Sequence, residues 1–293
     1  MAPAALSPAH LSDLLKRKLL FVTGKGGVGK TAVSQAIALH LSELGRQTLW
    51  VTFSDPLLPP GHRQQKTPNL TYLNCDPTSA FEEYNSLKIG ISGLARIFLR
   101  NSLMRYLAKA SPGVNEVVLM GKVWYETRNF EHVVVDMPST GYGLAMFNSA
   151  RNYAKLFTGG PVQKDAEKML ATFGDATASG CLVVGLPEEM PICESLELYD
   201  KLLEFFPANP SAFLVNKVFP KVPSQIDPNS DTWPSPVPKS ASDYAQRRTL
   251  VEAMNLRVFS EKGFSYSELE LTVSPSSLIR QLAIEIGRDG GHA

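Results

Sequence analysis

A glycine-rich segment with two lysines, TGKGGVGKT at residues 23–31, offers the clearest chemistry in the chain. Residues 24–31 fit the pattern G-x-x-x-x-G-K-[ST], in which successive backbone N–H groups can face phosphate oxygens. Lys30 would reach the β- and γ-phosphates of a nucleotide, and the Thr31 hydroxyl would take a Mg²⁺ position. The segment therefore predicts an ATP site, to which the following residues would contribute: Gly24, Gly26, Gly27, Val28, Gly29, Lys30, Thr31 and Ala32.

Two aspartates that follow predicted strands could complete such a site. Asp55 comes after the strand expected at residues 48–53, where a carboxylate can hold and polarise an attacking water. Asp136 lies at the end of the strand expected at residues 132–137, where a P-loop enzyme places the carboxylate that binds Mg²⁺ through water. A simpler alternative exists for each, an Asp-Pro turn and a helix cap. We expect Asp55 and Asp136 to lie near the metal ion with Thr31.

Short β-branched runs alternate with helical patterns along the chain, which is typical of βαβ units and a parallel sheet. Several runs have almost no alternation of apolar and polar residues, as expected when helices cover both faces of a sheet. The pattern predicts an α/β fold, a doubly wound and mostly parallel sheet. Strands are expected at residues 18–22, 48–53, 70–75, 132–137, 181–186, 212–218 and 256–259, and helices at 30–44, 192–206 and 276–287.

Two stretches lie outside this rhythm and suggest the domain organisation. Residues 77–130 are mostly helical in pattern and, together with residues 141–178, predict a helical subdomain inserted in the sheet. Residues 219–240 contain six prolines and predict an irregular loop. We expect one P-loop ATPase domain at residues 18–293, preceded by an N-terminal helical arm at residues 1–17.

Bulk properties exclude several classes of protein. The chain has 293 residues, 44% of them hydrophobic, and a net charge of +1, which disfavours a broad nucleic-acid-binding surface. Cys75, Cys181 and Cys193 form no C-x-x-C pair, suit a reduced cytosol and are expected to be packing residues. No secretory signal and no apolar run long enough to span a bilayer is evident. We expect a cytoplasmic protein that binds no nucleic acid.

The second lysine of the loop, Lys25, is not needed for phosphate binding alone. GKGGVGK[ST] resembles the deviant P-loop of an ATPase class that includes the MinD and ParA positioning ATPases, nitrogenase iron protein, and the arsenite-pump and tail-anchored-protein-targeting ATPases. In that class the extra lysine reaches across a nucleotide-sandwich dimer to the partner's phosphates, much as an arginine finger does. The resemblance implies a dimer in which Lys25 acts in catalysis beside Lys30 and Asp55.

Further segments resemble one branch of the class, the arsenite-pump (ArsA) and tail-anchored-protein-targeting ATPase family. FSDPLL at residues 53–58 keeps the Asp-Pro of a first switch that reads S-T-D-P-A-H, and DMPSTGYGLA at 136–145 keeps four residues of the second switch, D-T-A-P-T-G-H-T-L-R. NLTYLNCDPTSAFEEY, SPGVNEV and LVNKVFP, at residues 69–84, 111–117 and 214–220, also resemble family segments. The resemblance implies that Asn216 hydrogen-bonds the adenine edge, while Pro220 and Phe259, in a loop at residues 258–261, flank the ring.

The chain departs from the family pattern where cargo is handled. Tyr142 replaces the histidine of the second switch and Ala145 its arginine, and the segment that follows contains few methionines. The apolar segment at residues 91–110, with its basic edge, could line a client groove, touch an acidic membrane surface or pack as a lid on its own core.

The family resemblance implies an ArsA-like dimeric ATPase that hydrolyses Mg-ATP to move a helical subdomain, which handles a protein or membrane-associated client. The dimer could pair two copies or join this chain to a paralogous ATPase. Two alternatives remain, a hydrolysis-poor regulatory or scaffold subunit of a heterodimer and a positioning ATPase like MinD or ParA.

Overall fold

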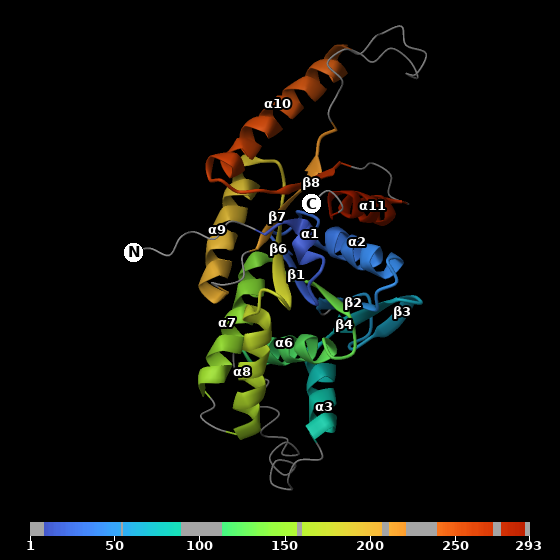
Figure 1. Cartoon of the computed structure of the whole chain (residues 1–293), viewed down its shortest axis with the longest axis vertical. Helices are drawn as coiled ribbons and strands as arrows, with labels where there is room; N and C mark the ends of the chain where they lie inside the picture. The colour runs from blue at the N-terminus through green and yellow to red at the C-terminus, as the bar shows by residue number, and fades with distance from the viewer. Residues whose placement is uncertain are drawn as a thin grey trace.

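A central sheet organises the computed structural model, which describes residues 9–53, 55–88, 113–156, 160–206, 211–220, 239–271 and 277–290. Within those residues the sheet has eight strands in the order β3-β4-β2-β5-β1-β6-β7-β8 (Figure 1). Each neighbouring pair is parallel except β3 and β4. The strands are β1 Leu19–Gly24, β2 Thr48–Phe53, β3 Arg63–Thr67, β4 Leu70–Cys75, β5 His132–Asp136, β6 Ser179–Gly185, β7 Ala212–Val218 and β8 Ser267–Glu270.

Helices cover both faces of this sheet. Helices α1, α2 and α11 pack on one face, and α6, α7, α8 and α9 pack on the other (Figure 1). The doubly wound α/β fold expected from the sequence is therefore confirmed. The helices are α1 Leu11–Leu14, α2 Lys30–Glu43, α3 Pro77–Lys88, α6 Val114–Glu126, α7 Thr140–Leu156, α8 Gly160–Gly174, α9 Glu189–Phe205, α10 Lys239–Glu261 and α11 Leu278–Gly290.

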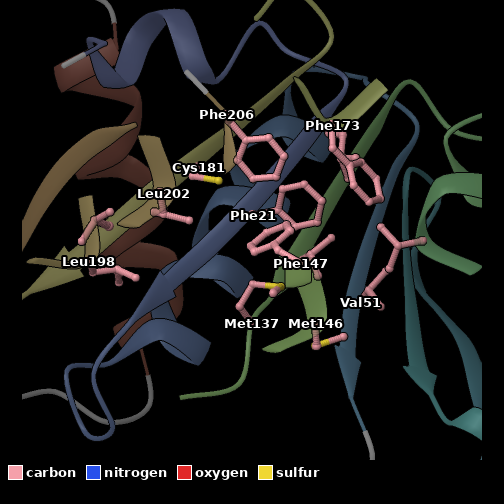
Figure 2. Close-up of a cluster of buried hydrophobic side chains, with 14 of the residues drawn as sticks. Phe21, Val51, Met137, Met146, Phe147, Phe173, Cys181, Leu198, Leu202 and Phe206 are labelled. Atoms are coloured by element: carbon pink, nitrogen blue, oxygen red, sulfur yellow. The ribbon is translucent and has the colours of Figure 1, made fainter. Parts of the chain in front are cut away.

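Strand β1 explains why the buried strands lack alternation. Its successive side chains enter opposite cores, Phe21 on the face covered by α7 and α8 and Val22 on the face covered by α2. The Phe21 ring packs edge-to-face against the rings of Phe147 and Phe173, and the ring centroids of each pair are 5.2 Å apart (Figure 2). Because both faces are buried, every position of the strand is apolar or small.

The strand order places a topological switch point at the carboxyl end of β1. This strand lies between β5 and β6, and the chain leaves it toward β2 on one side before returning to β6 on the other. In open α/β sheets such a reversal separates the loops that follow the strands and leaves room for a ligand. Val22 pairs with Asp136 and Gly24 with Val184, so the loops after β1, β5 and β6 start close together.

One predicted strand is wrong. Residues 256–259 do not form a strand but belong to α10, and no loop is present at residues 258–261. The run LRVF has the composition of a short strand, yet the buried residues Glu252, Leu256 and Phe259 recur at helical spacing. Strand β8 occupies the sheet edge instead, at residues 267–270.

Strands β3 and β8 carry little sequence signal for the same reason, since both lie at edges of the sheet. The side chains of β3, RQQKT, are mostly exposed, and its antiparallel pairing with β4 includes a register shift between Gln65 and Thr67. Polar residues and irregular pairing are common at edge strands, where they discourage pairing with other chains. Their absence from the sequence-based prediction follows from this polarity.

The predicted helical subdomain is described in part. Its ranges contain α3 and α6, which precede β5 in the chain, and α7 and α8, which follow it. The segment at residues 91–110, the proline-rich residues 221–238 and residues 1–8 of the N-terminal arm lie outside the described residues. None of the helices in the described ranges is both long enough and apolar enough to cross a membrane.

Candidate active site

The glycine-rich loop connects β1 to α2 and has backbone angles that require glycine. Gly27 and Gly29 have φ values of 84° and 96°, in the left-handed region that other residues rarely adopt. A Cβ on Gly29 would lie 2.4 Å from Nδ2 of Asn216, so the loop also packs closely against its support. Gly29 occupies the N-cap of α2 without a side-chain hydrogen bond. The first N–H groups of α2 are therefore offered toward the loop, as an anion site requires.

The other loop residues that were predicted at the ATP site differ in solvent exposure. Lys25, Gly26 and Gly27 are exposed at its mouth, whereas Val28 is buried. Ala32 lies half-buried in the first turn of α2. The exposed stretch could contact a bound phosphate chain, and Val28 anchors the loop to the core.

Lys30 lies under this loop and donates a 2.8 Å hydrogen bond from Nζ to the carbonyl oxygen of Lys25. Burial lowers the pKa of Lys30, although the nearby charge of Asp136 opposes that shift. A nearby group with more negative charge would stabilise the charged form of this buried ammonium. The phosphates of a nucleotide would supply one.

Thr31 and Asp136 meet beside the loop, as the sequence predicted for the two. The Thr31 hydroxyl donates to Oδ2 of Asp136 across 2.6 Å. Burial raises the pKa of Asp136, while the Thr31 bond and the Lys30 charge act in the opposite direction. The second oxygen, Oδ1, is buried and has no hydrogen-bond partner within the described part of the chain. An orphaned carboxylate oxygen next to a hydroxyl fits the hard oxygen ligands that Mg²⁺ takes.

Asp55 sits in the loop after β2 and is held by β4. The side chain of Asn74 accepts a 2.8 Å hydrogen bond from the Asp55 N–H and donates to the carbonyl oxygens of Asp55, Leu58 and Pro59. The Tyr72 hydroxyl lies 3.4 Å from Oδ2 of Asp55, and burial raises the pKa of Tyr72, so this donor keeps its proton. Asn74 thus fixes the loop and Tyr72 fixes the carboxylate.

The Asp55 carboxylate also makes a turn, since its Oδ1 accepts a 2.9 Å hydrogen bond from the Leu57 N–H. This is the Asp-Pro turn that the sequence left open beside the catalytic interpretation. The two are compatible, because each carboxylate oxygen has a further lone pair. Tyr72 and Asn74 were not predicted from the sequence, although polar side chains in a strand with buried neighbours are a signal that could have identified them.

Asn216 supports the glycine-rich loop from the end of β7. Its Nδ2 donates a 2.8 Å hydrogen bond to the Val28 carbonyl oxygen, and its Oδ1 accepts from the Lys217 N–H at 3.0 Å. The pairing of β7 with β8 shifts register between Val215 and Val218, and Lys217 has a φ of 61°. Such a bulge re-aims a side chain. The structure therefore brings Asn216 to the loop that would hold phosphate.

The other two residues expected at the adenine ring lie in different environments. Pro220 is exposed just beyond β7. Phe259 is 1% exposed within α10, and its ring lies 4.9 Å from that of Phe213 and 5.0 Å from that of Tyr266. Phe259 is thus a core residue of a helix, whereas the sequence placed it in a loop.

Replacement of Asn216 with alanine is expected to weaken nucleotide binding about tenfold and to lower the free energy of unfolding by about 1–3 kcal/mol. The variant leaves the buried Val28 carbonyl without its donor, and an unsatisfied buried group costs free energy in that range. Titration with a fluorescent ATP analogue and chemical denaturation would measure both effects.

Asn69→Ala is the matched control, because the Asn69 side chain donates a 3.3 Å hydrogen bond to the Ser42 carbonyl oxygen and lies just before β4, at the sheet edge opposite the loop. It should alter stability alone. Unchanged nucleotide affinity in the Asn216 variant would contradict a supporting role for that side chain.

The second switch segment contacts α6. Tyr142, which stands where the resembled family has histidine, hydrogen-bonds Glu116 in the SPGVNEV segment. Burial raises the pKa of Tyr142, and the charge and hydrogen bond of Glu116 raise it further. Asp136 and Tyr142 are only six residues apart, so a change at the metal position has a short route to α6. The role of Glu116 was not predicted from the sequence.

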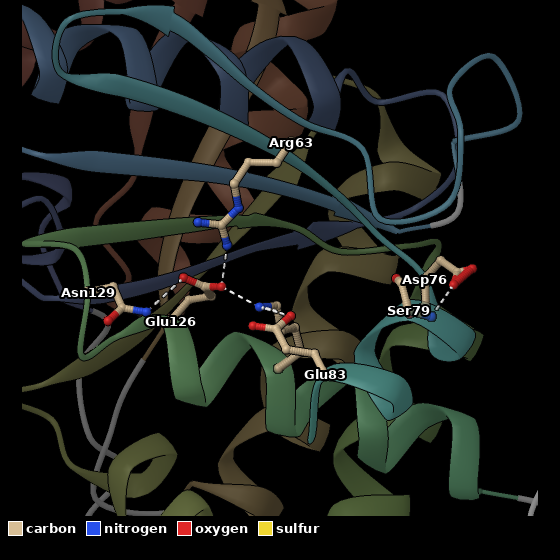
Figure 3. Close-up of polar contacts among 7 residues, drawn as sticks. Arg63, Asp76, Ser79, Glu83, Glu126 and Asn129 are labelled. Carbon is tan, nitrogen blue, oxygen red and sulfur yellow. Dashed lines mark hydrogen bonds and ion pairs between the residues drawn. The ribbon is translucent and has the colours of Figure 1, made fainter. Parts of the chain in front are cut away.

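A partly buried ion network connects α6 to β3, which follows the first switch segment (Figure 3). Glu126, which is 1% exposed, pairs with Arg63 of β3 and lies 2.5 Å from Nζ of Lys122; Lys122 also pairs with Glu83 of α3 at 2.5 Å. Arg63 follows the loop that carries Asp55. Burial alone would raise the pKa of Glu126, but Lys122 and then Arg63 hold that pKa below its ordinary value.

Glu126→Gln is expected to lower the free energy of unfolding at neutral pH by about 2–4 kcal/mol, because it leaves the buried Lys122 ammonium and the partly exposed Arg63 guanidinium without this carboxylate. A depressed pKa means that the folded state favours the ionised form. This stabilisation is therefore complete above the ordinary carboxylate pKa of about 4 and disappears as the pH falls through the lower folded value. Urea unfolding across that pH range should show the wild type and variant converging in acid.

The exposed pair of Glu131 with Arg46 supplies the control, since Glu131→Gln should change stability by no more than about 1 kcal/mol. A stability difference for Glu126→Gln that stays constant into acid would contradict the linkage.

The cysteines divide into two kinds. Cys75 and Cys181 are buried, and burial raises the pKa of each thiol to about 12, as suits packing residues. The prediction of packing is wrong for Cys193, which is exposed on α9. Its neighbour Ile192 takes the inward position on that helix. Within the described residues, no group of three or more His, Cys, Asp or Glu side chains is arranged to hold a metal ion by itself.

Comparisons with known proteins agree with this geometry. The family model described as anion-transporting ATPase matches residues 17–160. ATPase BagA of Mycobacterium tuberculosis is 28% identical over 247 residues, which cover 75% of this chain and 69% of that protein. ATPase get3 of Schizosaccharomyces japonicus is 29% identical over 168 residues, 48% of this chain and 47% of its own. The arsenical pump-driving ATPase of Acidiphilium multivorum is 32% identical over 146 residues, 43% of this chain and 24% of its own.

Proposed function

Because this chain belongs to the ArsA/GET3-like ATPase family, we propose that it binds Mg-ATP between two protomers and hydrolyses it. The observation that carries the proposal is the meeting of Thr31 with Asp136 beside the glycine-rich loop. Oδ1 of Asp136 has no hydrogen-bond partner among the described residues, Lys30 lies under the loop, and Asp55 lies just after β2, the strand beside β5. These are the groups that phosphoryl transfer needs.

Each side chain has a distinct task in this proposal. The loop N–H groups and Lys30 bind the phosphates, and Asn216 keeps the loop in place from behind. Thr31 and Asp136 would hold Mg²⁺, which would neutralise charge on the phosphates when bound. Asp55 orients the attacking water and, with its carboxylate aimed by Tyr72, accepts a proton from that water.

In this proposal a second protomer contributes its Lys25 to the nucleotide site of the first. Lys25 is 57% exposed at the loop mouth, on the side that a second protomer would approach. Exposed apolar side chains surround this edge: Leu57 after Asp55 is 88% exposed, Tyr142 is 42% exposed and Met190 is 66% exposed. Exposed apolar groups gathered at one edge are typical of an interaction face. A homodimer, or a heterodimer with a paralogous ATPase, would cover them.

Hydrolysis would move the helical subdomain through two connections to α6. Tyr142 joins the second switch to Glu116 near the start of this helix, and Arg63 joins the first switch region to Glu126 at its end. A change in either switch therefore acts on α6 directly. We expect α3, α7 and α8 to follow, since α6 packs against all three. A protein or membrane-associated client would be handled by these helices.

Steady-state hydrolysis and size measurement test the proposal together. The purified chain should hydrolyse ATP with Mg²⁺ and lose that activity when EDTA removes the metal. Light scattering after size exclusion should show twice the monomer mass with ATP and a smaller species without nucleotide. A chain that binds ATP yet stays monomeric and inactive would contradict the proposal. Assembly only with a second ATPase would favour the regulatory subunit instead.

A further inference from the structure

Lys25 has an acidic partner within its own chain. Its ammonium contacts Oε1 of Glu194, which lies in the second turn of α9 and is 27% exposed. The sheet explains why they meet: Gly24 pairs with Val184, so the loop after β1 starts beside the end of β6, and α9 follows β6 directly. The ion pair is therefore at the same edge as the proposed nucleotide site. Glu194 was not predicted from the sequence.

This contact conflicts with the action of Lys25 across an interface. An ammonium that lies against Glu194 cannot at the same time reach the phosphates bound to another protomer. We infer that Glu194 holds Lys25 within its own protomer until ATP is bound, and so restrains dimer formation by the empty chain. The inference rests on the proposed function, because it concerns the lysine that the dimer would use.

ATP has a direct means of weakening this hold. Nζ of Lys30 donates to the carbonyl oxygen of Lys25 and fixes the start of the loop. Phosphates that draw Lys30 toward themselves break that hydrogen bond and free the backbone of Lys25. The same phosphates compete with Glu194 for the Lys25 ammonium. Binding of ATP thus acts on the main chain and on the side chain of one residue.

The ion pair between Lys25 and Glu194 is suited to dissociate when ATP binds rather than to stabilise the fold. Both side chains are partly exposed, and exposed ion pairs contribute little to folding. The apolar side chains of Ile192 and Leu196 fix α9 to the core on either side of Glu194. Loss of the carboxylate should therefore leave the fold intact while releasing Lys25.

Glu194→Gln tests the inference without a change of shape. With ATP present, the variant should form dimers at a protein concentration about two- to fivefold lower than the wild type, the range expected for an exposed ion pair. Without nucleotide, an amine-reactive reagent should label Lys25 faster by a similar factor, as followed by peptide mass spectrometry. Glu197→Gln is the matched control, because Glu197 is exposed on the same helix one turn further on. It should behave like the wild type in both measurements.

A double-mutant comparison separates the ion pair from a general effect of charge. If Glu194 acts through Lys25, then Glu194→Gln should change dimer formation only when Lys25 is present, and not in a Lys25→Ala chain. An equal effect in both backgrounds, or unchanged Lys25 labelling in Glu194→Gln, would overturn the inference alone. A wild-type chain that never forms dimers with ATP would overturn the proposed function as well.

Discussion

Replacement of Lys25 with alanine is expected to reduce the turnover number for ATP about a thousandfold or more, while ATP affinity stays within about threefold of wild type. Cations placed where charge develops during γ-phosphoryl transfer have effects of this size. Binding should persist because Lys30, the loop N–H groups and Asn216 remain. Single-turnover hydrolysis and equilibrium ATP titration would separate the two quantities.

Mixing two inactive variants decides whether Lys25 acts on its own nucleotide or on that of the partner. A dimer of Lys25→Ala with Asp55→Asn has one site in which the first protomer supplies Asp55 and the second supplies Lys25. If the lysine acts across the interface, the mixture should regain hydrolysis at about one site per dimer. If it acts within its own chain, every site lacks one group and the mixture stays inactive.

A surface lysine controls for the loss of charge. Lys16 is exposed on the chain just after α1, where it pairs with Asp13 at 3.1 Å, and Lys16→Ala should hydrolyse ATP normally. Full activity of the Lys25 variant would remove the reason to place that lysine in the reaction.

Asp55→Asn is expected to lower the turnover number by about 10²–10⁴-fold, the range associated with loss of a positioned general base. The amide cannot accept a proton from water, yet it can still accept the 2.9 Å hydrogen bond from the Leu57 N–H. The bonds from Asn74 reach the Asp55 backbone and remain as well. Stability should therefore change little, and thermal unfolding measured beside steady-state hydrolysis would check this.

Asp175→Asn is a close control for the turn itself. Asp175 also accepts a hydrogen bond from the N–H two residues later, that of Thr177 at 2.8 Å, but it lies before β6 at the opposite edge of the sheet. This variant should retain activity. Normal turnover in Asp55→Asn would leave Asp55 as a turn residue only, the simpler of its two interpretations.

Local sequence patterns predicted the elements that carry the site. Strands at residues 48–53, 70–75 and 212–218 were predicted with their exact observed limits, because buried parallel strands are short apolar runs bounded by polar residues. The loop at residues 24–31 and the carboxylate Asp136 were predicted at the junctions of such elements. The glycine-rich loop follows one predicted strand and Asp136 ends another. Because the carboxyl ends of parallel strands lie at the same edge of a sheet, Thr31 and Asp136 were expected to lie close together.

Partners contributed by distant segments could not be predicted in this way. Glu194 meets Lys25 only because β6 lies beside β1, and Glu116 meets Tyr142 only because α6 packs on α7. Nothing in the spacing of these residues specifies either contact. The re-aimed side chain of Asn216 depends on a bulge in β7, and single-sequence periodicity does not detect bulges.

The exposed thiol of Cys193 gives the chain a natural attachment point for a spectroscopic probe. The other two cysteines are buried with thiol pKa values of about 12, so a maleimide dye at neutral pH should react at this position without any substitution. Cys193 precedes Glu194 on the same turn of α9. A fluorophore there would lie beside the contact between Lys25 and Glu194. Its emission could report in real time, in the natural sequence, when ATP binding breaks that contact.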